Sequence, residues 1–347
     1  MNFYNTTHLH YCGIDLHARS LYVCIIDHDG KTLLHKEISA NPESLYRLIE
    51  PYIDDLVVGV ECMHCWYWVA DFCEDHGIHF ILGHALYMKA IHGGKTKNDR
   101  IDSYKIAKLM RGGNFPLAYV YPREMRATRD LLRRRTRIVR HGADLKAHIV
   151  NTTSQYNLPP NKVNLKNVGA RDQLKSTFQN PEAQFNIDLD LNILECYHRE
   201  LSKLEWHLEQ QAKHHNPVCF SLLRSIPGVG RILALTILYE IGDIQRFESV
   251  QNFASYSRLV KCKAESAGKT YGTQGNKIGN AHLKWAFSEA AVLFLRGNPD
   301  AQKYLQRLQK RMNKAKALSA LAHKLGRAVY FMLKQEKVFD ENKFLAG

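Results

Sequence analysis

The chain has 347 residues, of which 45% are hydrophobic, enough for more than one globular domain with a buried core. Lysine and arginine outnumber aspartate and glutamate by 48 to 34, a formal net charge of +14, so nucleic acid is the expected large partner, ahead of an anionic membrane surface. No run of about 18 apolar residues is present, which excludes a membrane-spanning helix, and no signal-peptide pattern begins the chain. We expect a cytoplasmic protein without disulfides.

The N-terminal part predicts strands that alternate with helices. Three apolar runs within residues 11–37, separated by short breaks, predict a three-stranded antiparallel meander. The next elements, in chain order, are a helix over 41–53, a buried strand over 56–61, a helix over 66–77 and a strand over 78–83. Strands and helices in the order βββαβαβα are typical of the ribonuclease-H and actin-like ATPase group.

From residue 122 to 215 the strand signal disappears and the sequence becomes long, charged and helical. Proline-containing breaks at 157–162 and 178–184 interrupt it. We therefore expect an α/β domain over residues 1–121, a helical, coiled-coil spacer over 122–215, and a mainly helical domain over 216–347.

The first helix of this spacer is rich in arginine. Its planar guanidinium suits phosphate, which favours contact with a nucleic-acid backbone over the alternative of a merely solvated helix. The residues concerned are Arg126, Arg129, Arg133, Arg134, Arg135, Arg137 and Arg140.

Two features of the C-terminal part could also meet nucleic acid. The turn "IPGVG" at 226–230 lies between two helical patterns and is typical of a helix-hairpin-helix, in which the N–H groups of Gly228 and Gly230 would face a DNA phosphate; an ordinary helix–helix turn is the alternative. Residues 261–277 predict an electropositive loop that places Ser266 among lysines, including Lys269, before a helix that starts near Asn280. Such a field would activate a serine nucleophile toward phosphate, although most loop serines are merely polar.

Four carboxylates are candidates for a metal site. Asp15 lies in the first strand of the meander and Glu61 ends the next buried strand, and these strands would be neighbours in a ribonuclease-H-like sheet. Asp99 and Asp102 stand one turn apart at the start of a later helix, where the alternative is a role as N-cap and first-turn residue. Acids gathered together repel each other unless a cation lies among them, so the set predicts a divalent ion, Mg²⁺ or Mn²⁺.

The series "GIDLH", "VGVE", "KNDRID", "IPGVG" and "ESAGK…GNAHLKWA" resembles the DEDD transposases of bacterial insertion sequences, the family numbered one hundred and ten, across nearly the whole chain. This family includes Piv-type DNA invertases and bridge-RNA-guided recombinases. The resemblance implies a RuvC-like N-terminal domain in which Asp15, Glu61, Asp99 and Asp102 bind divalent metal. It also implies a C-terminal transposase domain whose nucleophilic serine corresponds to Ser266, with Ser255 and Ser257 as neighbouring serines.

Members of the family link covalently to DNA through that serine. They act as homo-oligomers, here a dimer or tetramer, and are guided by a structured RNA made from the ends of their own element. The resemblance therefore implies a DNA recombinase with DNA and RNA as partners.

Three other functions remain open. A Holliday-junction-type nuclease would use the same four acids with water in place of Ser266. A sugar kinase or actin-like ATPase would share the first strands, but we find no second phosphate loop or adenosine motif. A binding protein without catalysis would need only the basic surfaces, and Asp102→Asn would leave it intact.

Overall fold

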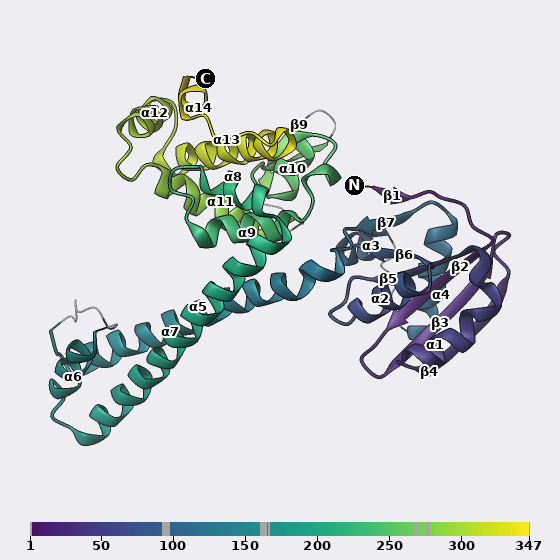
Figure 1. The fold of residues 1–347 in the computed structure, drawn as a ribbon, viewed down its shortest axis with the longest axis horizontal. Helices are drawn as coiled ribbons and strands as arrows, with labels where there is room; N and C mark the ends of the chain where they lie inside the picture. The colour runs from purple at the N-terminus through teal and green to yellow at the C-terminus, as the bar shows by residue number, and fades with distance from the viewer. Residues whose placement is uncertain are drawn as a thin grey trace. The chain divides into compact units, whose positions relative to one another are not determined.

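The computed structural model describes residues 2–91, 98–159, 165, 167–266, 269–274 and 278–346. The chain forms two compact units, Met1–Arg123 and Glu124–Gly347. In Figure 1 the colour runs from purple at the start of the first unit to yellow at the end of the second. A separate spacer domain over residues 122–215 stays a prediction.

The first unit is an α/β structure. Its elements are β1 (Phe3–Tyr4), β2 (His10–Leu16), β3 (Ser20–Asp27), β4 (Thr32–Ser39), α1 (Pro42–Ile49), the 3₁₀ helix η1 (Glu50–Asp55), β5 (Leu56–Glu61), α2 (Tyr67–Asp75), β6 (His79–Gly83), α3 (Ala85–Ile91), α4 (Asp99–Arg111) and β7 (Phe115–Ala118).

These strands form one seven-stranded sheet in the order β1-β7-β6-β5-β2-β3-β4. Strands β2, β3 and β4 pair antiparallel, which confirms the predicted meander, while β5 pairs parallel with both β2 and β6. The prediction that the strands of Asp15 and Glu61 are neighbours is therefore confirmed. Strands β1 and β7 were not predicted, because two and four residues, one of them Pro116, carry too little periodicity.

Helices cover both faces of the sheet (Figure 1). On one face, apolar residues of α1 and α2 pack on alternate residues of β2, such as Ile14 and Leu16. On the other face, α4 packs through Ile106 and Met110 against Tyr11 and Val57. Strand alternation places Asp15 on the α4 face, since it shares the parity of Tyr11 rather than of Ile14.

The second unit consists mainly of helices. Its elements are α5 (Arg123–Gln155), α6 (Val168–Ser176), α7 (Pro181–His215), α8 (Pro217–Arg224), α9 (Arg231–Ile241), the 3₁₀ helix η2 (Ile244–Arg246), α10 (Val250–Tyr256), β8 (Cys262–Ser266), β9 (Lys269–Gln274), α11 (Ala281–Phe294), α12 (Pro299–Gln309), α13 (Lys314–Gln335) and α14 (Glu341–Ala346).

Helices α5 and α7 run antiparallel, as Figure 1 shows and two ion pairs confirm. Arg135 of α5 pairs with Glu205 of α7 at 2.8 Å. Further along α5, the Nδ1 atom of His148 lies 2.6 Å from Asp190, nearer the start of α7. The breaks predicted in this region are confirmed, because α6 stands between the two long helices.

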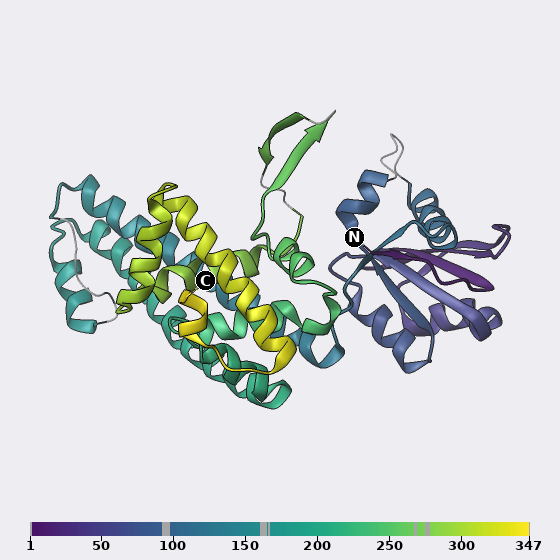
Figure 2. The ribbon, with the colours of Figure 1, turned by 90° about the horizontal axis from the view of Figure 1, so that it is seen from above.

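Helices α8 to α14 pack around one apolar core, which includes Tyr239, Phe253, Phe287 and Phe294. One prediction here was wrong in detail. Within the electropositive loop predicted over 261–277, β8 and β9 form a β-hairpin, which stands out from the helices in Figure 2, while residues 267–268 and 275–277 lie outside the described part of the chain. Near the C-terminus, α13 begins as a new helix after α12, because Asn313 caps it by accepting a hydrogen bond from the Lys316 N–H at 2.9 Å.

Over the residues that the structure describes, no helix combines the length and the apolar character that crossing a membrane requires.

Candidate active site

Asp15 and Glu61 lie at the same edge of the sheet. The last paired positions of the parallel strands β2 and β5 are Ile14 and Val60, and each acid is the next residue of its strand. Because the strands are parallel and in register, both carboxylates fall on the α4 face. Both side chains are partly exposed.

Helix α4 supplies the other two acids. Asp99 and Asp102 lie in its first turn, while the N-cap is Asn98, whose side chain accepts a hydrogen bond from the Arg100 N–H at 3.0 Å. Capping therefore does not explain Asp99. Asp102 forms an ion pair with Lys105 at 3.1 Å.

Two glycines in the sheet allow α4 to approach closely. A Cβ atom on Gly13 would lie 2.3 Å from the carbonyl oxygen of Ser103 in α4, and one on Gly59 would lie 2.3 Å from the sulfur of Met110. Both glycines share the face of Asp15 and Glu61. This close packing places the first turn of α4 beside the ends of the strands.

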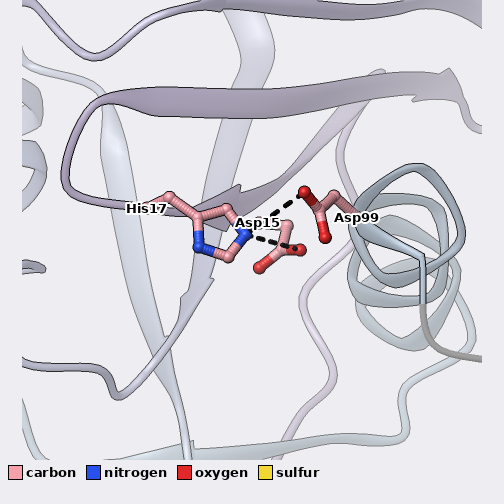
Figure 3. A group of neighbouring side chains, drawn as sticks. All are labelled: Asp15, His17 and Asp99. Atoms are coloured by element: carbon pink, nitrogen blue, oxygen red, sulfur yellow. Dashed lines mark ion pairs between the residues drawn. The ribbon is translucent and has the colours of Figure 1, made fainter.

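Asp15 and Asp99 meet at His17 (Figure 3). The Nε2 atom of His17 lies 3.5 Å from Asp15 and 3.4 Å from Asp99, and the three donor atoms all lie within 4.8 Å of one another. The sequence patterns above do not identify His17 as a site residue. The available signal was the spacing Asp-x-His at the end of a strand, which puts both side chains on one face.

The acids affect one another electrostatically. Burial raises the pKa of Asp15, and the negative charges of Asp99 and Asp102 raise it further, whereas His17 lowers it. The structure thus brings three of the four predicted acids into electrostatic contact. Glu61 lies on the neighbouring strand and is outside the group of three that converges on His17.

The donor set fits a divalent cation. Carboxylate oxygens are the preferred ligands of Mg²⁺ and Mn²⁺, whereas an imidazole nitrogen is a common ligand of transition metals. In the absence of an ion, a protonated His17 would reduce the repulsion between Asp15 and Asp99. The three side chains are therefore a candidate metal site.

Ser266 is the last residue of β8 and pairs in register with Lys269, the first residue of β9. Its side chain is outside the described part of the chain, and the backbone places it at the tip of the hairpin. Lys269 is exposed. Of the neighbouring serines, Ser257 is fully buried and Ser255 is exposed.

The arginines of α5 divide into two groups. Arg129 and Arg133 face inward and donate to the buried carboxylate of Glu240, with N–O distances of 3.0 and 2.7 Å. Arg126 is also buried. By contrast, Arg134 and Arg137 are exposed. Arg134 and Arg137 are therefore exposed for contact with nucleic acid, whereas Arg126 is buried and Arg129 and Arg133 already pair with Glu240.

The "IPGVG" turn joins α8 to α9 as predicted. Gly228 has φ +80°, and a Cβ atom there would lie 2.6 Å from the backbone of Leu293 in α11. Close packing of the turn on α11 therefore accounts for Gly228. Gly230 is exposed, and no atom lies within 4 Å of the position of its absent Cβ.

Two family models match separate parts of the chain. A model of DEDD transposases matches residues 12–158, which include the four acids and His17. A second model, described as the transposase IS116/IS110/IS902 family, matches residues 220–306, which include the hairpin. The chain belongs to this transposase family.

Several individual proteins similar to this chain have names that fit this family. The pilin gene-inverting protein of Moraxella bovis is 30% identical over 35% of this chain and 38% of its own. The transposase for insertion sequence element IS1111A of Coxiella burnetii is 25% identical over 70% of this chain and 68% of its own. A "Probable family 20 transposase" of Pseudomonas aeruginosa is 22% identical over 94% of this chain and 97% of its own. This chain spans less than half the length of two other curated relatives, 48% of one and 38% of the other.

Proposed function

We propose that this family member is a DNA transposase or site-specific recombinase, which cleaves and rejoins strands with metal-bound carboxylates and a serine nucleophile. The observation that carries the proposal is the convergence of Asp15, Asp99 and His17 at the sheet edge, in a chain whose other unit matches the same family. The sheet order, with a meander followed by parallel strands, supports a RuvC-like, ribonuclease-H-like assignment of the first unit.

The carboxylates of Asp15, Glu61, Asp99 and Asp102 would hold the divalent ion, either Mg²⁺ or Mn²⁺. When bound, the ion supplies charge stabilisation at the scissile phosphate. His17 would orient Asp15 and Asp99, or complete the donor set.

Ser266 would attack the phosphorus atom of the scissile phosphodiester. A bond forms between its oxygen and phosphorus while the bond to the 3′-oxygen breaks, and the serine proton is transferred to that leaving oxygen. In the reverse step, a 3′-hydroxyl of another strand attacks the phosphorus of the phosphoserine. A new phosphodiester forms, and the serine hydroxyl is released. Lys269, opposite Ser266 in the hairpin register, would stabilise the charge on the phosphate oxygens.

Basic surfaces of the second unit support binding of DNA. Arg134 and Arg137 project from α5. In addition, residues 301–335 contain nine lysines and arginines and no acid. Seven of them are exposed, and all but Arg327 lie around the junction of α12 and α13: Lys303, Arg307, Lys310, Arg311, Lys314 and Lys316. Such density suits a phosphate backbone.

Guidance by a structured RNA from the element's own ends, and action as a dimer or tetramer, rest on the family resemblance. The basic charge is compatible with both nucleic acids.

The test is junction PCR on cells carrying the gene with its native flanks. We expect recombinant junctions from the wild type and none from Asp15→Asn or Ser266→Ala, with both variants soluble and still binding nucleic acid. Junctions that persist in Ser266→Ala would remove this serine as the nucleophile. Hydrolysed ends without junctions, independent of Ser266, would favour the junction nuclease.

A further inference from the structure

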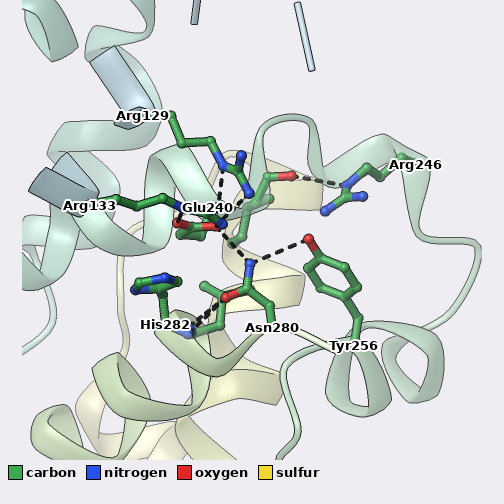
Figure 4. Close-up of polar contacts among 9 residues, drawn as sticks. Arg129, Arg133, Glu240, Arg246, Tyr256, Asn280 and His282 are labelled. Atoms are coloured by element: carbon green, nitrogen blue, oxygen red, sulfur yellow. Dashed lines mark hydrogen bonds and ion pairs between the residues drawn. The ribbon is translucent and has the colours of Figure 1, made fainter. Parts of the chain in front are cut away.

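A buried carboxylate in the second unit belongs to neither proposed reaction centre. Glu240 of α9 is 1% exposed. It receives hydrogen bonds from Arg129 and Arg133 of α5, and its Oε2 atom also accepts one from the Asn280 side chain at 2.8 Å (Figure 4). These bonds outweigh the effect of burial, which alone would raise the pKa of Glu240, and hold it at about 2.

Asn280 has two functions at this position. Its side-chain oxygen caps α11 by accepting hydrogen bonds from the N–H groups of His282 and Leu283 at 2.9 and 3.0 Å. Its side-chain amide nitrogen donates to Glu240 and lies 3.4 Å from the hydroxyl of Tyr256. The cap and the bridge therefore use different atoms of one side chain.

The same residues fix the base of the β8–β9 hairpin. The Asn280 N–H donates to the Tyr256 carbonyl at 2.6 Å, and Arg258 Nε donates to the Ile278 carbonyl at 3.2 Å, so the chain before the hairpin is joined to the chain after it. Gly279 has φ +100°, and a Cβ atom there would lie 2.6 Å from the Tyr256 carbonyl. Only glycine allows this close crossing without strain.

Arg246 also contacts the ring of Tyr256. The guanidinium of Arg246 lies 4.4 Å from the centroid of the Tyr256 ring and 4.4 Å from that of Phe247. Arg246 Nε also donates to the Ile241 carbonyl at the end of α9, at 3.0 Å. The hairpin base is thus tied to α9 at both Glu240 and Ile241.

We propose that Glu240 and Asn280 are positioning residues, which fix the hairpin bearing Ser266 relative to helices α5 and α9. This inference rests on the proposed function, because it assigns the hairpin a reacting serine. Desolvating a carboxylate and its arginine partners costs free energy that apolar packing would not, so stability alone gives a poor reason for the cluster. Directional bonds to a fixed charge do provide a single orientation for the hairpin base.

The variant Asn280→Ser separates positioning from helix capping. Serine is as good an N-cap as asparagine, but it lacks the amide that reaches Glu240 and Tyr256. Asn313→Ser is the matched control, because Asn313 caps α13 in the same way and lies outside the cluster. A second variant, Glu240→Gln/Asn280→Asp, exchanges the amide and the carboxylate across the same contact and keeps a capping oxygen.

The measurement is the DNA that stays attached to the protein after denaturing capture from cells carrying the gene with its native flanks. Thermal unfolding and duplex-DNA affinity are measured on the same purified variants. We expect Asn280→Ser to lower attached DNA about 10- to 100-fold, with an affinity close to that of the wild type and of Asn313→Ser. The melting temperature should fall only slightly, because Arg129 and Arg133 still pair with Glu240. The exchanged double variant should recover part of the loss.

Two results would overturn the inference. Attached DNA at the wild-type level in Asn280→Ser would show that the bridge positions nothing. Losses of attachment, affinity and melting temperature in parallel, without recovery in the exchanged variant, would make the cluster a structural element only. If the wild type showed no attached DNA, or if the attached DNA persisted in Ser266→Ala, the proposed chemistry itself would fail. This inference would then fail with it.

Discussion

Gly13 determines how closely α4 can lie on the sheet, and therefore where Asp99 and Asp102 are placed. The neighbour of its absent Cβ is the backbone of α4, whereas the neighbour at Gly59 is the flexible end of Met110. A backbone cannot move aside without shifting the helix. The flexible sulfur of Met110 can rotate away.

The two glycines therefore predict different costs. We expect Gly13→Ala to destabilise the first unit by about 3 kcal/mol and Gly59→Ala by about 1 kcal/mol. Thermal unfolding of the two variants, with hydrogen exchange of α4 amides to identify the affected unit, makes the comparison. Equal costs at the two positions would contradict the close-packing account.

Glu240 predicts how the second unit responds to acid. Its pKa is about 2 in the folded chain against an ordinary value of 4.5, because bonds from arginine and asparagine outweigh burial. A group with a lowered pKa stabilises the folded state above its ordinary value, and that stability is lost as the pH falls from 4.5 toward 2. The shift corresponds to about 3 kcal/mol.

Acid unfolding followed by circular dichroism tests this expectation. Glu240→Gln should be less stable than the wild type at pH 7 and should lose less stability on acidification. A wild type and variant with parallel pH profiles would show that Glu240 does not carry the effect.

At the residue scale, the sequence allowed the acids to be identified but not their surroundings. Asp15 and Glu61 could be placed together because strand parity and neighbouring strands follow from periodicity. His17 was not assigned a role, because a single histidine after a strand has no periodic signal. The bond between Asn280 and Glu240 joins residues far apart in sequence, and no local pattern reports such a contact.

At the scale of elements, α5 is the clearest case in which composition and structure differ. Seven arginines predicted one nucleic-acid-binding helix, and the structure gives the helix an inward and an outward group. The difference arises because α9 presents a carboxylate to α5, a tertiary contact that charge counting cannot predict. Likewise, the glycines and lysines of residues 261–277 predicted a loop, although within this range residues 262–266 and 269–274 pair as a hairpin.

The two groups of α5 predict separate effects. Arg134→Ala/Arg137→Ala should weaken binding to nucleic acid and reduce the slope of log affinity against log salt by about 1 to 2, with an unchanged melting temperature. Arg133→Ala should instead lower stability by roughly 1–3 kcal/mol, because it removes bonds from a buried carboxylate. Fluorescence anisotropy at several salt concentrations and thermal unfolding distinguish them. A salt slope that changes only in Arg133→Ala would reverse the assignment.

At the scale of the whole molecule, the proposed chemistry is divided between two units. The acids and His17 belong to the first unit, and Ser266 belongs to the second. One family model matches residues 12–158, which contain the acids and His17, and the other matches residues 220–306, which contain Ser266. The fold class of each unit followed from periodicity, whereas short strands and helix breaks required tertiary contacts to define them.

The most direct test of the account is mass spectrometry of the peptide that remains linked to DNA after denaturing capture and digestion. The account predicts a nucleotide phosphate on Ser266 in the wild type, and no linked peptide in Ser266→Ala or in Asp15→Asn. A phosphate on another residue, or strand cleavage with no linked peptide at all, would contradict the serine mechanism.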